Sequence, residues 1–241
     1  MADDGLRRGV SCTTRFGLQE YCSGEESRPM ADPAMRGRTG SLKRHEGDGD
    51  MVVLRVLLFV LLLIPCRVEA FEQYNKVKKF DIYFKKYSKR FFGPGFDWRY
   101  FKAQSIAESG LKPEAESRVG AVGLMQIMPR TYDEIVQKHP YIKGSRDDPR
   151  WNVAAGIFYD RLLWKAWKAE RAFTDRLNFM FGSFNAGRAN IVRAQKIAER
   201  VGLDPVHWES IEATLPKITG KRSRETINYI NKIHEVKEVL R

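Results

Sequence analysis

The feature that most constrains the fold is a helical spacing of apolar residues, which begins at Phe71 and continues to the end of the chain. Apolar side chains recur at intervals of three and four, and no segment shows sustained two-residue alternation, the pattern of a half-buried strand. The sequence therefore predicts an all-α chain from residue 71 onward. The first apolar stripe, separated by lysines, consists of Val77, Phe80, Phe84, Tyr87 and Phe91.

Turn and capping residues divide this part of the chain into separate helices. Gly93-Pro94-Gly95 should end the first helix, because both residue types interrupt helical backbone. Asp97 fits the N-cap of a second helix over residues 98–109, and Gly110 fits its C-terminal stop. This second helix is expected to carry Glu108 near its end.

Later helices are predicted from similar signals. Thr131 followed by Glu134 resembles a capping box, and Asp148 before Pro149 predicts another helix start. Thr174 opens a helix that Gly187 should end. Further helices are expected near residues 189–201 and 224–240.

The first seventy residues differ from the rest. Residues 1–50 have almost no periodic apolar pattern, which predicts disorder. Residues 51–70 contain an arginine, an apolar run of about nine residues and a small residue at Ala70, the pattern of a secretory signal peptide. The run is shorter than the roughly 20 residues of a transmembrane helix. Because a secretory signal begins at the N-terminus, we interpret Met51 as the true start and residues 1–50 as an over-extended reading frame.

Two alternatives for this region remain open. Residues 1–50 could be a genuine tail that precedes a signal anchor. Cys66 could be the lipid-bearing cysteine of a lipoprotein, although Pro65 stands where such signals normally have a small residue. On the signal-peptide interpretation, residues 71–241 form a single domain exported across the inner membrane to the periplasm or cell envelope.

Charge and cysteine content limit the function classes. Lys and Arg balance Asp and Glu over residues 1–70, so the formal net charge of +12 belongs to residues 71–241. Such a surface favours a polyanion, whether nucleic acid, an anionic membrane or a wall polymer, unless it is simply a solvated face. Every cysteine precedes residue 70 and the four histidines are scattered. We therefore expect no disulfide, metal site or cofactor after that point.

The stretch from Glu108 to Pro129 carries the candidate chemistry. Glu108 follows apolar helix neighbours, and burial raises the pKa of a carboxyl group enough for it to act as a general acid at neutral pH. A lone glutamate near a helix end is usually a surface residue, so its surroundings matter. Ser117 offers a hydroxyl, Gln126 offers a donor and an acceptor that match an N-acetyl group, and Met128 offers soft apolar surface. Gly120 and Gly123 would let the backbone approach a ligand closely.

Four motifs in this order resemble the soluble lytic transglycosylase family, over roughly residues 75–235. They are Glu108-Ser109-Gly110 with Pro113, Ser117, Gly120-Ala121 and the run from Gly123 to Pro129; Ala155-Gly156-Ile157 with Tyr159; Phe184-Asn185-Ala186-Gly187; and Glu225-Thr226 with Tyr229-Ile230. One departure is Phe184, where the family has a tyrosine, so a phenol hydroxyl is missing there.

The resemblance implies a lysozyme-like domain of packed helices around a glycan-binding groove, acting on peptidoglycan without a cofactor. Glu108 would be the sole acid and base. It would protonate the MurNAc–GlcNAc β-1,4 oxygen and then accept the proton of the muramic acid C6 hydroxyl, giving a 1,6-anhydro product. The substrate-binding residues that the resemblance implies are Ser117, Gln126, Met128, Asn185 and Tyr229.

Three other functions compete with this interpretation. A hydrolytic muramidase on the same fold would give a reducing end instead of an anhydro end. A wall-binding protein without catalysis would not need Glu108. A nucleic-acid binder is suggested only by the charge, lacks a recognisable motif and would be separated from DNA by secretion. The expected partners are glycan strands, with electrostatic association to anionic envelope material and no nucleic acid.

The exported protein is predicted to begin at or near Phe71. N-terminal sequencing of protein recovered from the cell envelope would test this. Recovery of residues 1–50 on the mature protein would contradict it.

Overall fold

The computed structural model describes residues 71–241. The expected disorder of residues 1–50 and the expected signal peptide at 51–70 lie outside the described residues. Within them the chain is helical, with isolated bridges but no strand, which confirms the all-α prediction. No helix in this range is both long and apolar enough to cross a membrane. The elements are η1 (Gln73–Asn75), α2 (Asp81–Phe92), α3 (Arg99–Ser109), α4 (Pro129–Lys138), α5 (Pro149–Ala166), α6 (Phe173–Ala186), α7 (Arg188–Arg200), α8 (Trp208–Thr214), α9 (Pro216–Thr219) and α10 (Arg222–Val239).

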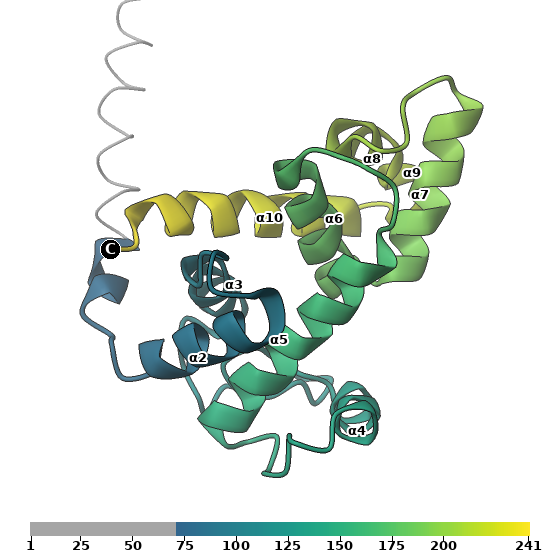
Figure 1. Cartoon of the computed structure of the whole chain (residues 1–241). Helices are drawn as coiled ribbons and strands as arrows, with labels where there is room; N and C mark the ends of the chain where they lie inside the picture. The colour runs from purple at the N-terminus through teal and green to yellow at the C-terminus, as the bar shows by residue number, and fades with distance from the viewer. Residues whose placement is uncertain (1–70) are drawn as a thin grey trace, which may run out of the picture. The chain divides into compact units, whose positions relative to one another are not determined.

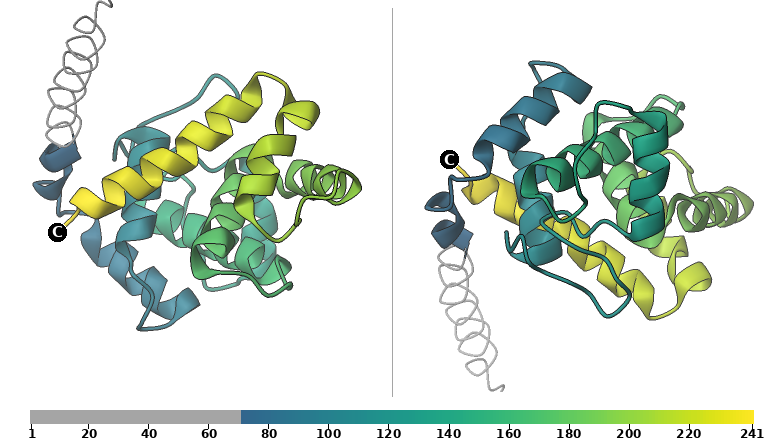
Figure 2. Two further views of the ribbon diagram at one scale, coloured as in Figure 1. Left: turned by 90° about the horizontal axis from the view of Figure 1, so that it is seen from above. Right: turned by 90° about the horizontal axis from the view of Figure 1, so that it is seen from below.

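The C-terminal helix α10 lies across α3 and α6, and the long helix α5 joins α2 on one side to α6 on the other. Figure 1 shows α10 running horizontally above α3, and the left panel of Figure 2 shows α10 crossing the other helices diagonally. Helices α7, α8 and α9 form a second group at the far end of α6.

Helix α3 is the central element. Its residues from Phe101 to Ile106 are all buried, so it is covered on most sides, as expected of a helix inside a core. Helix α10 contributes Tyr229, Ile230, Ile233 and Val236, whose spacing of three and four places them on one face. Packing this face on α3 brings together residues more than a hundred positions apart.

The first two helices follow the sequence prediction closely. The first begins at Asp81, so Val77 precedes it and only the later part of the apolar stripe is helical; it ends before Gly93, as expected. The second helix begins at Arg99 with Trp98 at the N-cap position, one residue later than predicted, although Asp97 Oδ1 still accepts a hydrogen bond from the backbone N–H of Arg99 at 3.0 Å. Gly110 ends α3 in the left-handed conformation, with φ of 64°.

Of the N-cap predictions for the next two helices, one is wrong and the other is confirmed. Helix α4 begins at Pro129, because proline suits the first helical position, so Thr131 lies inside the helix and caps nothing. Asp148 does cap α5, since its side chain accepts from the N–H groups of Arg150 at 2.8 Å and Trp151 at 3.2 Å. Helices α8 and α9 were not expected. Helix α8 is held by the buried ring of Trp208, which lies over Gly182.

Asn152 of α5 fixes the loop that follows α3. Its buried side chain accepts from Met125 N at 2.7 Å and donates to Val122 O and Arg146 O, both at 2.9 Å. Gly123 has φ of +79°, and a Cβ atom there would lie 2.4 Å from Asn152 Nδ2. The close approach expected at Gly123 is therefore made to a core asparagine and not to a ligand.

Asn152→Ala should lower the free energy of unfolding by about 3 kcal/mol, because it breaks three hydrogen bonds in the core and leaves the buried Met125 N–H without this acceptor; Val122 O keeps its hydrogen bond from Ile127 N. Asn190→Ala is the matched control, since Asn190 is only partly buried, donates to Ala186 O at 2.7 Å and accepts from the exposed Arg193 Nη1 at 3.5 Å, and should cost about 1 kcal/mol. Urea denaturation of both variants measures the difference. Equal losses would show that the Asn152 contacts do not anchor the loop.

Candidate active site

Two side chains from opposite ends of the domain meet at the end of α3. Tyr229 of α10 donates a hydrogen bond from Oη to Glu108 Oε1, with an O···O distance of 2.6 Å. Burial, and next the negative charge of Glu108, raise the pKa of Tyr229 well above its usual range. The hydroxyl therefore stays protonated and remains the donor. This contact unites two of the residues that the family resemblance indicated.

The carboxyl group of Glu108 is poised near neutrality. Burial is the largest influence and raises its pKa to about 7. The Tyr229 hydrogen bond lowers the pKa, nearby Glu225 raises it, and Lys232 lowers it. At neutral pH the group is present in both its acid and its base form, which suits a residue that must first donate and then accept a proton.

Behind Glu108 lies a buried polar pair that the sequence analysis missed. Gln104, one turn earlier on α3, donates from Nε2 to Oδ1 of Asp160 on α5 at 3.3 Å. Both residues are fully buried. Burial, opposed by the Gln104 hydrogen bond and reinforced by the charge of Glu108, raises the pKa of Asp160 well above its usual range. The sequence signal that could have indicated this pair is a polar residue at a core position of each helix, Gln104 in α3 and Asp160 in α5.

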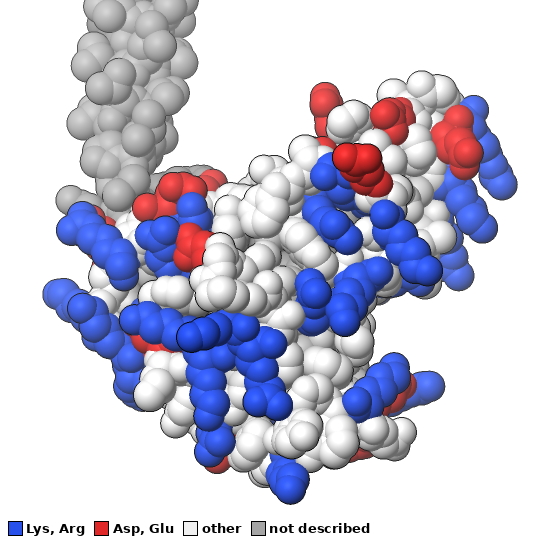
Figure 3. Space-filling model, viewed as in Figure 1, with Lys and Arg blue, Asp and Glu red and all other residues white. Residues whose placement is uncertain are grey.

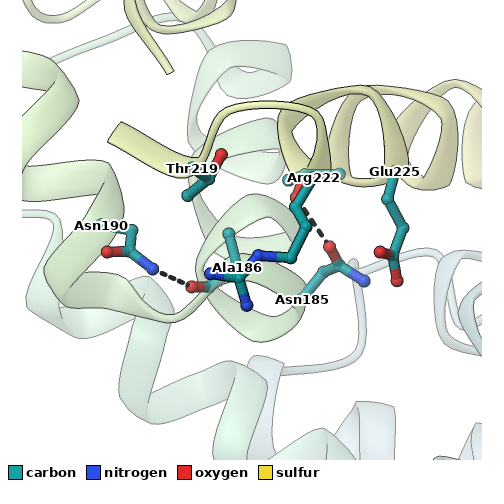
Figure 4. A pocket seen from close by; sticks show the side chains of 7 residues that line it. Asn185, Ala186, Asn190, Thr219, Arg222 and Glu225 are labelled. Atoms are coloured by element: carbon teal, nitrogen blue, oxygen red, sulfur yellow. Dashed lines mark hydrogen bonds between the residues drawn. The ribbon is translucent and has the colours of Figure 1, made fainter. Parts of the chain in front are cut away.

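Asn185 of α6 lies on the other side of the site. Its Oδ1 accepts from Thr226 Oγ1 of α10 at 2.8 Å, which joins two motifs of the sequence analysis. Figure 4 shows Asn185, Arg222 and Glu225 converging on a cavity of about 160 Å³. This cavity is lined by Asn185, Ala186, Asn190, Thr219, Arg222, Glu225 and Thr226. It offers amide, guanidinium and carboxylate groups to a polar ligand.

Gln126 and Ser117 are occupied within their own loop. Gln126, with an unusual φ of 45°, donates from Nε2 to Ala115 O and Gly123 O, both at 3.0 Å. Its amide donor is therefore used, and only its carbonyl oxygen is left for a ligand. Ser117 Oγ accepts from Ala121 N at 2.9 Å. Neither side chain hydrogen-bonds to Glu108 among the contacts of the described chain.

The two methionines of the loop differ in exposure. Met125 is fully buried against Gly156, whereas Met128 is 39% exposed and free to meet a ligand. Ser105 and Ser109 of α3 both donate to Leu124 O, at 2.8 Å and 2.9 Å. The Ser109 hydroxyl thus ties the loop to the helix instead of orienting the carboxyl of Glu108.

Phe184 packs its ring edge-on against Tyr159, with centroids 5.5 Å apart. Glu114, Glu116 and Asp133, acidic residues near this stretch of the sequence, are all exposed. Among residues 71–241 no group of three His, Cys, Asp or Glu side chains could hold a metal ion.

Comparison with known proteins identifies the family. A family model described as "Transglycosylase SLT domain" matches residues 83–204, about half of the chain. The chain belongs to the transglycosylase SLT domain family. The matched range ends before α10, so the helix that supplies Tyr229 completes the site from outside it.

Individual relatives agree with this assignment. "Membrane-bound lytic murein transglycosylase F" of Desulfosudis oleivorans is 30% identical over 158 residues, covering 61% of this chain and 34% of the relative. The protein of the same name from Shewanella pealeana is 26% identical over 177 residues, covering 69% and 35%. The chain thus spans about a third of the length of these relatives.

A solved structure shares the fold of this SLT domain. The 70 kDa soluble lytic transglycosylase SLT70 of Escherichia coli superposes with a TM-score of 0.51 and 24% identity, over 66% of this chain and 23% of that one. This likeness confirms the predicted fold class.

Glu108→Gln should stabilise the fold at neutral pH. The folded pKa of about 7 lies above the ordinary value of 4.5, so stability is lost as pH rises through this window and the neutral amide avoids the loss. The variant should gain about 1–3 kcal/mol at pH 7 and almost nothing at pH 4. Thermal unfolding at both pH values measures this, and an equal effect at the two would contradict the raised pKa.

Proposed function

We propose that this SLT domain is a peptidoglycan lytic transglycosylase in which Glu108 is the single acid and base. The observation that carries the proposal is the Glu108 carboxyl group, with a pKa of about 7 and a short hydrogen bond from a tyrosine that stays protonated. The lytic murein transglycosylases named above are its relatives, and the four motifs of the sequence resemble that family.

In the first step, protonated Glu108 donates its proton to the glycosidic oxygen between MurNAc and GlcNAc as that bond breaks. The 2.6 Å hydrogen bond from Tyr229 occupies Oε1, so the proton is delivered from Oε2. The substrate N-acetyl group shields the positive charge that develops at the anomeric carbon.

In the second step, the Glu108 carboxylate accepts the proton of the C6 hydroxyl as that oxygen bonds to the anomeric carbon. The product is a 1,6-anhydromuramoyl end, and Glu108 returns to its acid form. The Tyr229 hydrogen bond stabilises the intervening carboxylate, as its lowering of the Glu108 pKa indicates. No outside water is consumed.

The surroundings favour this route over hydrolysis by a retaining mechanism. Such hydrolases place a second ionised carboxylate about 5–5.5 Å from the acid, as nucleophile. Asp160, which lies behind Glu108, is unsuited to that role because it is fully buried with a pKa well above its usual range. A hydrolytic muramidase is the alternative outcome on the same fold.

Substrate contacts are assigned to the rest of the site. Met128 would pack against a sugar, Asn185 would line the groove beside the cleavage point, and Gln126 would accept a hydrogen bond through its remaining oxygen. Ser117 stays a predicted contact for the N-acetyl group.

Surface charge provides a second mode of attachment. Figure 3 shows lysines and arginines gathered over the face that carries α2, whose Lys85, Lys86, Lys89 and Arg90 are exposed. This face would associate with anionic wall material after export to the cell envelope.

Mass spectrometry of purified peptidoglycan digested by residues 71–241 tests the reaction. Anhydromuropeptides are expected; products with reducing ends would instead assign the enzyme as a muramidase.

Glu108→Gln should reduce release of anhydromuropeptides by about 10²–10⁴-fold, because both proton transfers pass through this group. Glycan binding and circular dichroism should remain those of the wild type. Glu199→Gln, an exposed glutamate near the end of α7, is the matched control and should keep full activity. Normal release by the Glu108 variant would falsify the assignment.

A further inference from the structure

Two buried polar atoms beside the active site have no partner among the described residues. They are Oε1 of Gln104 and Oδ2 of Asp160. These atoms belong to the same pair of side chains, which already share the 3.3 Å hydrogen bond from Gln104 Nε2 to Asp160 Oδ1. Each unpartnered buried acceptor is costly, so two in one contact require an explanation.

We propose that Asp160 is a neutral carboxylic acid whose Oδ2 proton bonds to Gln104 Oε1, and that this acid–amide ring positions Tyr229 and Glu108. A carboxylic acid has one O–H donor, and a primary amide offers both an acceptor and donors. One proton on Oδ2 therefore gives both orphaned atoms a partner. An ionised Asp160 would leave both acceptors buried without a donor.

The charges around the pair agree with a neutral acid. Asp160 is paired with no cation in residues 71–241, and the charge that acts on it is the like charge of Glu108. The other titratable groups near the network are Tyr159 on the same helix, whose pKa is raised by burial and by Asp160, and Glu225 and Lys232 on α10, which act on Glu108. Burial thus meets no compensating positive charge at Asp160.

The ring would direct the hydrogen bonds that reach the reacting group. Gln104 also lowers the pKa of Tyr229, which burial raises, as a hydrogen-bond donor does. With its oxygen held by Asp160, Gln104 can present only N–H to Tyr229 Oη. Tyr229 must then point its own proton at Glu108 Oε1, which leaves the acidic proton of Glu108 on Oε2. Gln104 and Asp160 are in this sense positioning residues.

This inference deepens the proposed function, because its consequence for Glu108 depends on that reaction. The protonation of Asp160 and the ring itself can be tested without activity. The three measurements below therefore separate failure of the ring from failure of the proposed reaction.

The first test compares the stability of wild type and Asp160→Asn as a function of pH. Unfolded Asp160 loses its proton above about pH 3.9 whereas the folded residue keeps it, so the wild type should be destabilised relative to the variant as pH rises. The ratio of the two unfolding constants should change by up to about tenfold per pH unit between pH 5 and 7. A constant ratio, or a variant that is less stable at pH 7, would overturn the neutral acid. The contribution of Glu108 is common to both proteins and cancels.

The second test is infrared difference spectroscopy of wild type minus Asp160→Asn at pH 7. A protonated carboxyl C=O band that shifts in D₂O is expected in the wild type and absent from the variant. A carboxylate band in its place would overturn the proposal.

The third test compares Asp160→Leu with Asp160→Asn in anhydromuropeptide release. Leucine removes the ring, so kcat should fall roughly three- to tenfold, the range of one hydrogen bond, with little change in KM. Asparagine rebuilds both hydrogen bonds and should restore most of kcat. In the pH profile of kcat, the alkaline limb that reflects Glu108 should stay at its wild-type pH. A limb displaced to lower pH in Asp160→Asn would show that an anion had been removed, and would overturn the proposal. If the leucine variant does not fold, the asparagine profile and the first two tests still decide it.

Discussion

The site depends on the packing of α10 against α3. Neither Glu108 nor Tyr229 is unusual within its own helix, and the 2.6 Å hydrogen bond between them exists only because the two helices cross where both side chains point inward. The apolar face of α10, from Tyr229 to Val236, supplies the burial that holds this crossing. The same burial raises the pKa of Glu108, so one packing interface provides both the geometry and the electrostatics of the site.

The loop between α3 and α4 depends on a different set of contacts. Asn152 holds its backbone from α5, and Ser105 and Ser109 hold Leu124 O from α3. The polar side chains that the sequence suggested for ligand binding mostly hydrogen-bond within the loop itself. Gln126, for example, donates two hydrogen bonds to carbonyl oxygens of its own loop. A loop fixed in this way holds Met128 at the surface in one position, and a preformed surface of this kind loses little entropy when a ligand binds.

Three carboxyl groups near the site have three environments. Glu108 is desolvated but stabilised by Tyr229 and can titrate near neutrality, Asp160 is buried without a cation and keeps its proton, and Glu225 remains exposed. Such separation is how a protein assigns distinct roles to chemically similar groups. It also explains why a count of acidic residues in the sequence could not identify which of them acts.

Sequence alone determined the helical class, several helix ends and the identity of Glu108 as the candidate acid, because periodicity, caps and motifs are local properties. It also indicated Tyr229 and Asn185, through motifs whose order was readable. Only the tertiary structure decided that the Gln126 amide donor is hydrogen-bonded within its own loop and that Gly123 makes room for Asn152. It alone also decided that Gln104 and Asp160 lie behind Glu108. These facts depend on side chains from α3, α5 and α10 meeting in one core, and burial and pairing across such distances leave no local trace in the chain.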